Sequence, residues 1–249
     1  MIKGLYEAAA GLQAQAMAQE IRSNNLANME TVGFKKDTPF FRILTSQGAS
    51  SGSSAAQDQQ QASCVVVGGT TTDFSQGPLR ETDNPLDLAM QGDGFFVVKF
   101  GNKQGYTRAG NFKIGSDGEI VDQNGFPVQA ARGELRVPEG AEVLVDTNGD
   151  VFADGNSVGS LRLVTFEDKS VLNKAGSNIW VTKTDDVQPK DVTDPEVYQG
   201  FLESSNANMI EEMVSMIDGM RQFDMHQKSI SSLLDDTVGK TIDTLPNLR

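Results

Sequence analysis

The sequence contains only one cysteine and one histidine in 249 residues, Cys64 and His226. A single cysteine excludes an internal disulfide and any zinc site built from several cysteines. A single histidine excludes every catalytic or metal-binding constellation that needs two. His226 lies between Met225 and Gln227, where a polar contact on a helix is a simpler interpretation than a Ser-His-Asp triad. The commonest cysteine and histidine chemistry is therefore absent.

Long apolar runs and a basic surface are also missing. No run approaches the roughly 18 apolar residues that a membrane-spanning helix needs. The start of the chain, residues 1–7, lacks the apolar segment and cleavage site of a secretory signal peptide, so we expect no cleaved signal. The net charge is −13, from 21 Lys and Arg against 34 Asp and Glu, whereas nucleic-acid binding requires a basic stripe. We expect neither membrane insertion nor a nucleic-acid partner.

Proline and aromatic residues are scarce at both ends of the chain. The first 28 residues contain no proline and one aromatic residue, Tyr6. Residues 202–245 also contain no proline and only one aromatic residue, Phe223. Most of the 25 glycines lie in the middle, between residues 65 and 160. This distribution predicts an α+β protein in which two helical ends bracket a turn-rich β domain.

Both ends carry narrow apolar stripes at heptad spacing. The N-terminal stripe is made mostly of small residues, and the C-terminal stripe is rich in methionine. Asn206 is the expected N-cap of the C-terminal helix. Each stripe must pack against another surface to be stable. That surface is the other stripe, the middle domain or another subunit, and the pattern alone does not distinguish these possibilities. The N-terminal stripe is Ile2, Leu5, Ala9, Leu12 and Ala16, and the C-terminal stripe is Met209, Met213, Met216, Met220, Phe223, Gln227, Ile230 and Leu234.

The middle of the chain reads as β-structure. Gly94–Phe100, Leu161–Phe166 and Ile179–Thr182 are expected strands. Three Asp-Gly or Asn-Gly pairs, at 117–118, 124–125 and 148–149, are hairpin signals whose spacing favours a sandwich- or barrel-like domain. The predicted division is an N-terminal helix and motif over 1–35, a connecting segment over 36–75 with a low-complexity loop at 45–63, a β-rich domain over 76–200, and a C-terminal helix region over 201–249.

Reactive and ligand-binding motifs are not evident in the sequence. The loops at 92–94 and 146–150 lack the Lys of a phosphate loop and the closing Glu of a calcium loop. Carboxylates are frequent, but nothing selects the pair that a glycosidase would need. We therefore predict no enzyme activity, no catalytic residue, no cofactor and no metal site. Two other classes stay open, a secreted adhesin or carbohydrate-binding module and a hydrolase that uses two carboxylates.

Three separated motifs resemble those of the bacterial flagellar axial proteins, the family of rod, hook and hook-associated proteins. The first is SNNLAN at 23–28 followed by TxGFK at 31–35, and the second is GxGFF at 92–96 with YTRxGxF at 106–112. The third is YQGFLESSN at 198–206 followed by EEMVxMI at 211–217. In the first motif we expect Asn28 to end the helix in a left-handed cap, Gly33 to permit a turn and Phe34 to anchor the following chain.

The resemblance implies an extracytoplasmic structural subunit of the flagellar basal body. In this family the terminal helices pair as a coiled-coil-like inner layer of a helical tube that transmits torque, and the β domain faces outward. The implied partners are copies of the chain itself, neighbouring rod proteins and the flagellar type III export apparatus, which exports such chains without a cleaved signal.

Within the family, the length resembles that of a rod protein rather than a hook protein. The run at 220–225 resembles a proximal-rod member, and a distal-rod member or a rod paralogue is the alternative. The residues implied in assembly are Leu5, Ala9, Leu12, Ala16, Asn24, Asn25, Leu26, Ala27, Asn28, Gly33, Phe34, Tyr198, Gly200, Ser205, Asn206, Met209, Met213, Met216, Met220, Phe223, Ile230 and Leu234.

Overall fold

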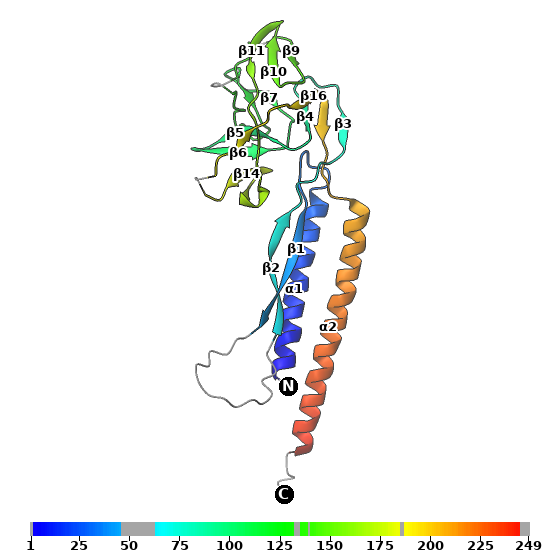
Figure 1. The fold of residues 1–249 in the computed structure, drawn as a ribbon. Helices are drawn as coiled ribbons and strands as arrows, with labels where there is room; N and C mark the ends of the chain where they lie inside the picture. The colour runs from blue at the N-terminus through cyan, green and yellow to red at the C-terminus, as the bar shows by residue number, and fades with distance from the viewer. Residues whose placement is uncertain (1, 46–62, 132–134, 139, 185–186, 245–249) are drawn as a thin grey trace, which may run out of the picture. The chain divides into compact units, whose positions relative to one another are not determined.

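The computed structural model describes residues 2–45, 63–131, 135–138, 140–184 and 187–244 (Figure 1). The chain divides into two compact units. A helical unit comprises Met1–Leu26, Asp37–Thr72 and Asn208–Arg249, and a β unit comprises Ala27–Lys36 and Asp73–Ala207. Most of the predicted low-complexity loop, 46–62, lies outside the described residues.

The N-terminal helix, α1, spans Ile2–Ala27 and confirms the helix predicted at this end. It ends in a turn in which the backbone carbonyl of Asn28 accepts a hydrogen bond from Thr31 N (3.1 Å) and Asn28 Oδ1 accepts one from Thr31 Oγ1 (3.2 Å). Asn28 does not have a positive φ, so the predicted left-handed cap at this residue is wrong. The left-handed position is Gly33, with φ of +64°, which confirms the predicted turn there.

The C-terminal helix, α2, spans Met209–Thr244. Its cap is Asn208, whose Oδ1 accepts from Ile210 N at 3.0 Å and whose carbonyl accepts from Glu212 N at 3.0 Å. The prediction that Asn206 is the N-cap is therefore wrong by two residues. Glu211 and Glu212 lie in the first turn, where negative charge interacts favourably with the positive end of the helix dipole.

A long hairpin completes the helical unit. β1 (Asp37–Thr45) pairs antiparallel with β2 (Ser63–Thr72), with a register shift between Phe40 and Phe41. These strands fall inside the stretch that we interpreted as a connecting segment. The sequence does not predict this hairpin, because its two strands are separated by low-complexity sequence rather than by a recognisable tight turn.

The largest sheet of the β unit has six strands in the order β13-β14-β6-β5-β12-β15, and all its neighbouring pairs are antiparallel. The three predicted strands are confirmed as β5, β12 and β14. The bounds are β5 Phe95–Phe100, β6 Lys103–Thr107, β12 Leu163–Thr165, β13 Leu172–Gly176, β14 Ile179–Thr182 and β15 Lys190–Asp191.

Apolar clusters cover both faces of this sheet. Along β5, Phe96 and Val98 belong to one buried cluster, and Phe95 and Val97 belong to the other. Adjacent residues of a strand point to opposite faces, so a strand covered on both sides has a continuous apolar run instead of an alternating pattern. Trp180, only 1% exposed, anchors the second cluster.

The rest of the β unit consists of small open sheets. A three-stranded sheet has the order β11-β10-β9, and the pairs β16-β4, β17-β3 and β7-β8 are two-stranded. Glycines 118, 125 and 149 all have positive φ, which confirms the three predicted turns. The bounds are β3 Leu79–Glu81, β4 Leu88–Gln91, β7 Lys113–Ile114, β8 Ile120–Val121, β9 Val143–Val145, β10 Asp150–Ala153, β11 Asn156–Ser160, β16 Glu196–Gln199 and β17 Phe201–Glu203, with a short 3-10 helix, η1, at Lys169–Val171.

Candidate assembly surfaces and the motif junction

The apolar side chains of α2 are largely exposed to solvent. Met220, a residue of the predicted stripe, is 56% exposed. Ile210, which lies next to the stripe, is 71% exposed. Complete burial of a side chain of this size stabilises a protein by about 1.5–3 kcal/mol. These side chains are more than half exposed, so much of that stabilisation is absent in the isolated subunit. Of the predicted stripe, Met209, Met213, Met220, Phe223 and Leu234 are exposed, and Met216 and Ile230 are half-buried.

On α1, the buried residues lie beside the predicted stripe rather than on it. Ala14 and Ala18 are buried, whereas Ala9 and Ala16 are exposed. Leu12 is half-buried. The side chain of Leu5 is outside the described part of the chain. The small-residue stripe thus leaves exposed alanines on α1, and its role in assembly stays a prediction.

The described hydrogen bonds between α1 and α2 come from polar side chains of α1. Gln15 Nε2 donates to the Gly219 carbonyl at 3.1 Å, and Arg22 Nη1 donates to the Ser215 carbonyl at 2.9 Å. One turn further along, Asn25 Nδ2 donates to Glu212 Oε1 at 3.1 Å. As the α1 position rises from 15 to 25, the α2 position falls from 219 to 212, which is an antiparallel arrangement.

Gly219 marks the close approach between these helices. A Cβ atom on this residue would lie 2.7 Å from Arg22 Nη1 and 2.9 Å from Gln15 Nε2. Both Gln19 amide atoms are buried here without a described hydrogen-bond partner. This polar face of α2 was not among the sequence predictions. Its signal is the small or polar character of residues 212, 215, 219 and 226 at helical spacing.

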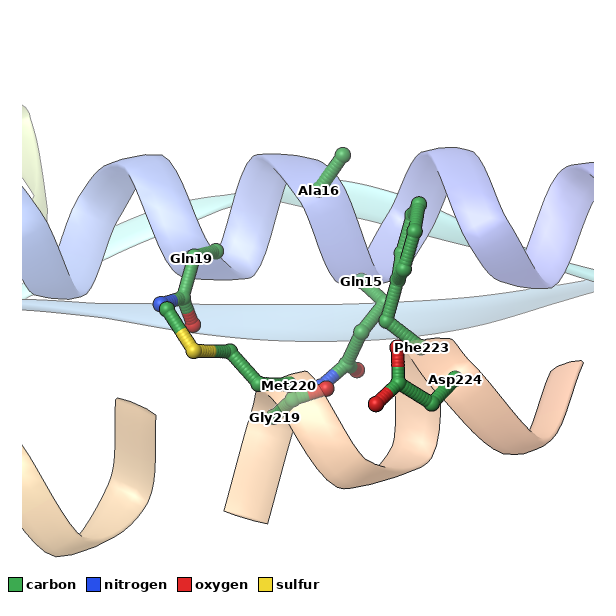
Figure 2. A pocket seen from close by; sticks show the side chains of 7 residues that line it. All are labelled: Gln15, Ala16, Gln19, Gly219, Met220, Phe223 and Asp224. Atoms are coloured by element: carbon green, nitrogen blue, oxygen red, sulfur yellow. The ribbon is translucent and has the colours of Figure 1, made fainter. Parts of the chain in front are cut away.

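A groove of about 430 Å³ opens where α1 and α2 run side by side. In Figure 2 the side chains of Met220 and Phe223 extend from α2 toward α1, and Ala16 lies on α1. The lining is Gln15, Ala16, Gln19, Gly219, Met220, Phe223 and Asp224. Three residues of the predicted assembly set, Ala16, Met220 and Phe223, therefore meet at one groove.

In the β unit, Glu203 joins the three sequence motifs. Its carboxylate contacts Lys35 Nζ at 2.5 Å and Arg108 Nη1 at 3.3 Å. The carboxylate also accepts from Gly77 N at 2.9 Å, and the Glu203 carbonyl accepts from Gly33 N at 2.7 Å. One residue thus binds the N-terminal motif, the middle motif and the segment before β3. Its role was not visible in the sequence, because its partners are distant in the chain.

The ionic cluster is almost completely buried. The side chains of Lys35, Glu203 and Arg108 are 0%, 1% and 3% exposed. Burial lowers the pKa of Lys35 below its usual 10.5, and the neighbouring carboxylate of Glu203 opposes that shift. The pKa of Arg108 is lowered by burial as well, again against the attraction of Glu203. Two buried cations share one carboxylate, so that carboxylate is essential to the cluster.

Backbone carbonyls accept further hydrogen bonds from the two cations, although the buried Arg108 Nε has no described partner. Lys35 Nζ donates to the Ser75 carbonyl at 2.7 Å. Arg108 donates to the carbonyls of Met90 (3.2 Å) and Gly92 (2.5 Å). The three acceptors come from the connection before β3, from β4 and from the turn after β4, so the cluster fixes these segments to the two motifs.

Asn206 is a clamp rather than a helix cap. Its Oδ1 accepts from Lys36 N at 2.8 Å, and its Nδ2 donates to the carbonyls of Asp73 (2.8 Å) and Ser75 (3.1 Å). These bonds join the C-terminal motif to the end of the N-terminal motif and to the segment that follows β2. The sequence prediction identified an important asparagine but assigned it the wrong partners.

The turn between β13 and β14 holds the N-terminal motif from another side. Asn178, with a φ of +58°, donates from Nδ2 to the Val32 carbonyl at 2.6 Å. Lys174 Nζ donates to the Lys35 carbonyl at 2.9 Å and lies 4.6 Å from the centre of the Phe34 ring. Phe34 is buried by these contacts, which confirms its predicted role as an anchor. At Gly33, a Cβ atom would lie 2.4 Å from the Arg108 carbonyl carbon, so only glycine fits.

The other predicted motif residues are divided between contact and exposure. Asn25 is buried and exchanges two hydrogen bonds with the backbone of Asp37, at 2.8 and 2.9 Å. Ser205 is buried, and its Oγ accepts from the amide of residue 207 at 3.1 Å. Gly200 has φ of +78° and donates its N–H to the carbonyl of residue 87 at 2.8 Å. Asn24, Ala27 and Tyr198 are exposed, and Leu26 is half-buried.

The same residues offer no metal-binding arrangement. Within the described ranges, no group of three or more His, Cys, Asp or Glu side chains is arranged to hold a metal ion. Neither α1 nor α2 contains, in its described part, an apolar stretch of the length that crosses a bilayer.

Three family models match successive parts of the chain. Residues 5–35 match the model described as flagella basal body rod protein. Residues 89–153 match the flagellar hook protein FlgE/F/G D1 domain, and residues 198–235 match the flagellar basal body rod FlgEFG protein C-terminal model. The first and last models cover the two terminal motifs.

Curated relatives match over nearly the whole chain. The flagellar basal-body rod protein FlgG of Buchnera aphidicola subsp. Schizaphis graminum is 31% identical, over 93% of this chain and 96% of its own length. FlgF of Caulobacter vibrioides is 32% identical over 88% of this chain and 86% of its own length. FlgF of Salmonella typhimurium is 31% identical over 93% and 94%.

Proposed function

Because the chain belongs to the family of flagellar basal-body rod proteins, we propose that its terminal helices assemble with those of neighbouring subunits into the helical tube of the rod. The protein is a structural subunit of the flagellar basal body and not an enzyme, and it assembles with other flagellar rod proteins. The proposal concerns which part of the chain makes the contacts and what the assembled tube does.

The exposed apolar surface of α2 carries this proposal. An amphipathic helix of a self-contained globular protein turns its apolar side toward a core. On α2 the side turned toward α1 includes Ser215 and Gly219, and apolar residues such as Met213 and Met220 are exposed. Packing against neighbouring subunits would bury this surface. The exposed alanines of α1, Ala9 and Ala16, would allow helices to approach closely in a coiled-coil-like inner layer.

The β unit is the outer part of the subunit in this proposal. Its two apolar clusters lie within the unit, so its fold does not depend on the helices being covered. A tube of helices that carries such rigid bodies on the outside is suited to transmitting torque. We also propose that the chain reaches the rod through the flagellar type III export apparatus.

Within the family we propose a proximal-rod, FlgF-like position. The observation that supports it is the run Met220-Arg221-Gln222-Phe223-Asp224-Met225 in α2, which resembles the proximal-rod pattern. The alternative is a distal-rod, FlgG-like position. Relatives of both kinds match the chain at 31–32% identity, so the position must be measured.

The experiment is to locate the protein in isolated basal bodies. A short epitope would replace the exposed turn Asp154-Gly155, where a Cβ atom on Gly155 would meet only open space. Immunogold labelling should mark the rod near the inner membrane for a proximal subunit, and further outward for a distal one. Basal bodies that lack the protein, although the tagged chain restores motility to a deletion strain, would contradict the rod assignment.

A further inference from the structure

The side of α2 turned away from α1 carries an apolar ridge. Successive residues of an α-helix are about 100° apart, so Ile210, Val214 and Ile217 lie roughly opposite Gly219, which faces α1. All three are more than half exposed, and Ile210 is the most exposed of them. The row ends at Arg221, whose side chain is 76% exposed. We call these four residues the ridge.

The groove described above lies on another side of the same helix pair. Its apolar lining is Ala16 on α1 and Met220 and Phe223 on α2, and its one acidic lining residue is Asp224. Ala16 contributes a small side chain to the lining, and Met220 and Phe223 contribute its larger apolar side chains (Figure 2). A row of aliphatic side chains on a helix has the chemistry and the shape to fit a groove of this kind.

Charge gives the fit a direction. The ridge runs from three aliphatic residues to a basic residue at its C-terminal end, and the groove runs along α2 from Met220 to the acidic Asp224. A second α2 laid parallel to the first would bring Arg221 to Asp224 as its aliphatic residues cover Met220 and Phe223. The ion pair of Arg221 with Asp218 in its own helix is long, 3.9 Å, and exposed, so it holds the guanidinium weakly.

We propose that the ridge of one copy of this chain seats in the α1–α2 groove of a second copy, with the two α2 helices parallel. This inference rests on the proposed rod function and specifies one contact within it. The ridge and the groove are different surfaces, so the contact is head to tail. Such heterologous contacts build rings or open helical filaments, and a parallel arrangement keeps the same polarity for every subunit.

A charge-reversal mixing experiment tests the contact. In the full chain, Arg221→Asp places an acidic ridge against an acidic groove, and Asp224→Arg places a basic ridge against a basic groove. Each variant alone should self-associate about tenfold more weakly than the parent in analytical ultracentrifugation at low salt. An equimolar mixture should recover association, because both ridge-to-groove contacts in an alternating assembly then join opposite charges.

Recovery in the mixture would exclude an effect confined to one helix, because mixing two variants does not change the charges within either chain. Ser229→Asp and Gln222→Arg, both on exposed α2 positions outside the ridge and groove, are the matched controls and should associate like the parent. High salt should partly restore each reversed variant. Val214→Ser with Ile217→Ser should weaken association irrespective of salt.

Three outcomes would overturn the inference. They are reversed variants that associate like the parent, a mixture that stays as weak as its components, and a parent that remains monomeric at about 100 μM. The third outcome would point to a homologous rod protein as the occupant of the groove. None of these outcomes would remove the protein from isolated basal bodies, so failure of this contact is distinguishable from failure of the rod assignment.

Discussion

The two units of this chain use their apolar residues in opposite ways. The β unit buries them in clusters on both faces of one sheet. It also buries the ion cluster around Glu203, whose two cations donate hydrogen bonds to backbone carbonyls. The helical unit exposes long rows of methionine, isoleucine and valine on α2. The β unit therefore has its own apolar clusters, whereas the helical unit leaves exposed on α2 the apolar surface that we propose contacts other subunits.

The largest expected effect is a loss of stability of the β unit when its buried ion cluster is disrupted. Glu203→Gln leaves the buried Lys35 and Arg108 without their shared carboxylate, which should lower the free energy of unfolding by about 3–5 kcal/mol. Urea unfolding followed by Trp180 fluorescence measures this loss. Glu196→Gln, at an exposed position of β16, is the control. A loss below about 1 kcal/mol would show that the cluster is not required for stability.

The next effect should appear in assembly and leave folding unchanged. Met220→Glu places a charge on a side chain that is exposed in the subunit, so the unfolding free energy should change by no more than about 0.5 kcal/mol. Burying the new carboxylate between helices would cost several kcal/mol, and the variant should be missing from basal bodies. Met216→Glu should behave similarly, with a somewhat larger folding cost because Met216 is half-buried. Normal incorporation would refute assembly through this stripe.

A moderate effect is expected when the hydrogen bonds between α1 and the β1–β2 hairpin are removed. Asn25→Ala removes both hydrogen bonds to the backbone of Asp37 and the one to Glu212. The expected loss is about 1–3 kcal/mol in the helical unit, partly offset by the higher helix propensity of alanine. Hydrogen exchange at the Asp37 amide should accelerate, whereas exchange in β5 should not change. Ser23→Ala, exposed on the same helix, is the control.

The smallest effect concerns pH. The hydrogen bond from Lys169 lowers the pKa of Asp93 below its ordinary 3.8, against a weaker opposing effect of burial. A lowered carboxyl pKa stabilises the fold above pH 3.8, and this contribution is lost as the pH falls through the lower folded value. The Asp93 side chain is 70% exposed to solvent, so Asp93→Asn should cost only a few tenths of a kcal/mol at pH 6. Urea midpoints between pH 2.5 and 6 measure it. Lys169→Met should remove the same pH dependence, and a double variant should lose no more than either single one.

Local pattern was sufficient for several elements of this fold. The apolar run at 94–100 predicted β5, and the Asp-Gly and Asn-Gly pairs located three turns, because these signals depend only on neighbouring residues. The helices at the two ends followed from heptad spacing. The β1–β2 hairpin was missed because the pairing of Asp37 with Thr72 spans low-complexity sequence that gives no turn signal.

The roles of motif residues were harder to predict than their importance. Asn206 was expected to cap a helix, but its amide bridges Lys36 and Asp73. Lys35, Arg108 and Glu203 each lay in a recognised motif, yet nothing in the sequence shows that they contact one another. Hydrogen-bond partners of this kind depend on tertiary packing and cannot be obtained from spacing along the chain.

The contact between Lys35 and Glu203 also constrains the order of folding. The two residues are separated by 168 positions, so the contact closes a very long loop. Contacts of high sequence separation form slowly, because their loop entropy is lost before they contribute any stabilisation. The local turns at 118, 125 and 149 can form early, whereas the β unit is completed only when β17 joins it. When the chain emerges with its N-terminus first, Lys35 therefore lacks its Glu203 partner until nearly all of the β unit has appeared. The residues of α2 emerge last.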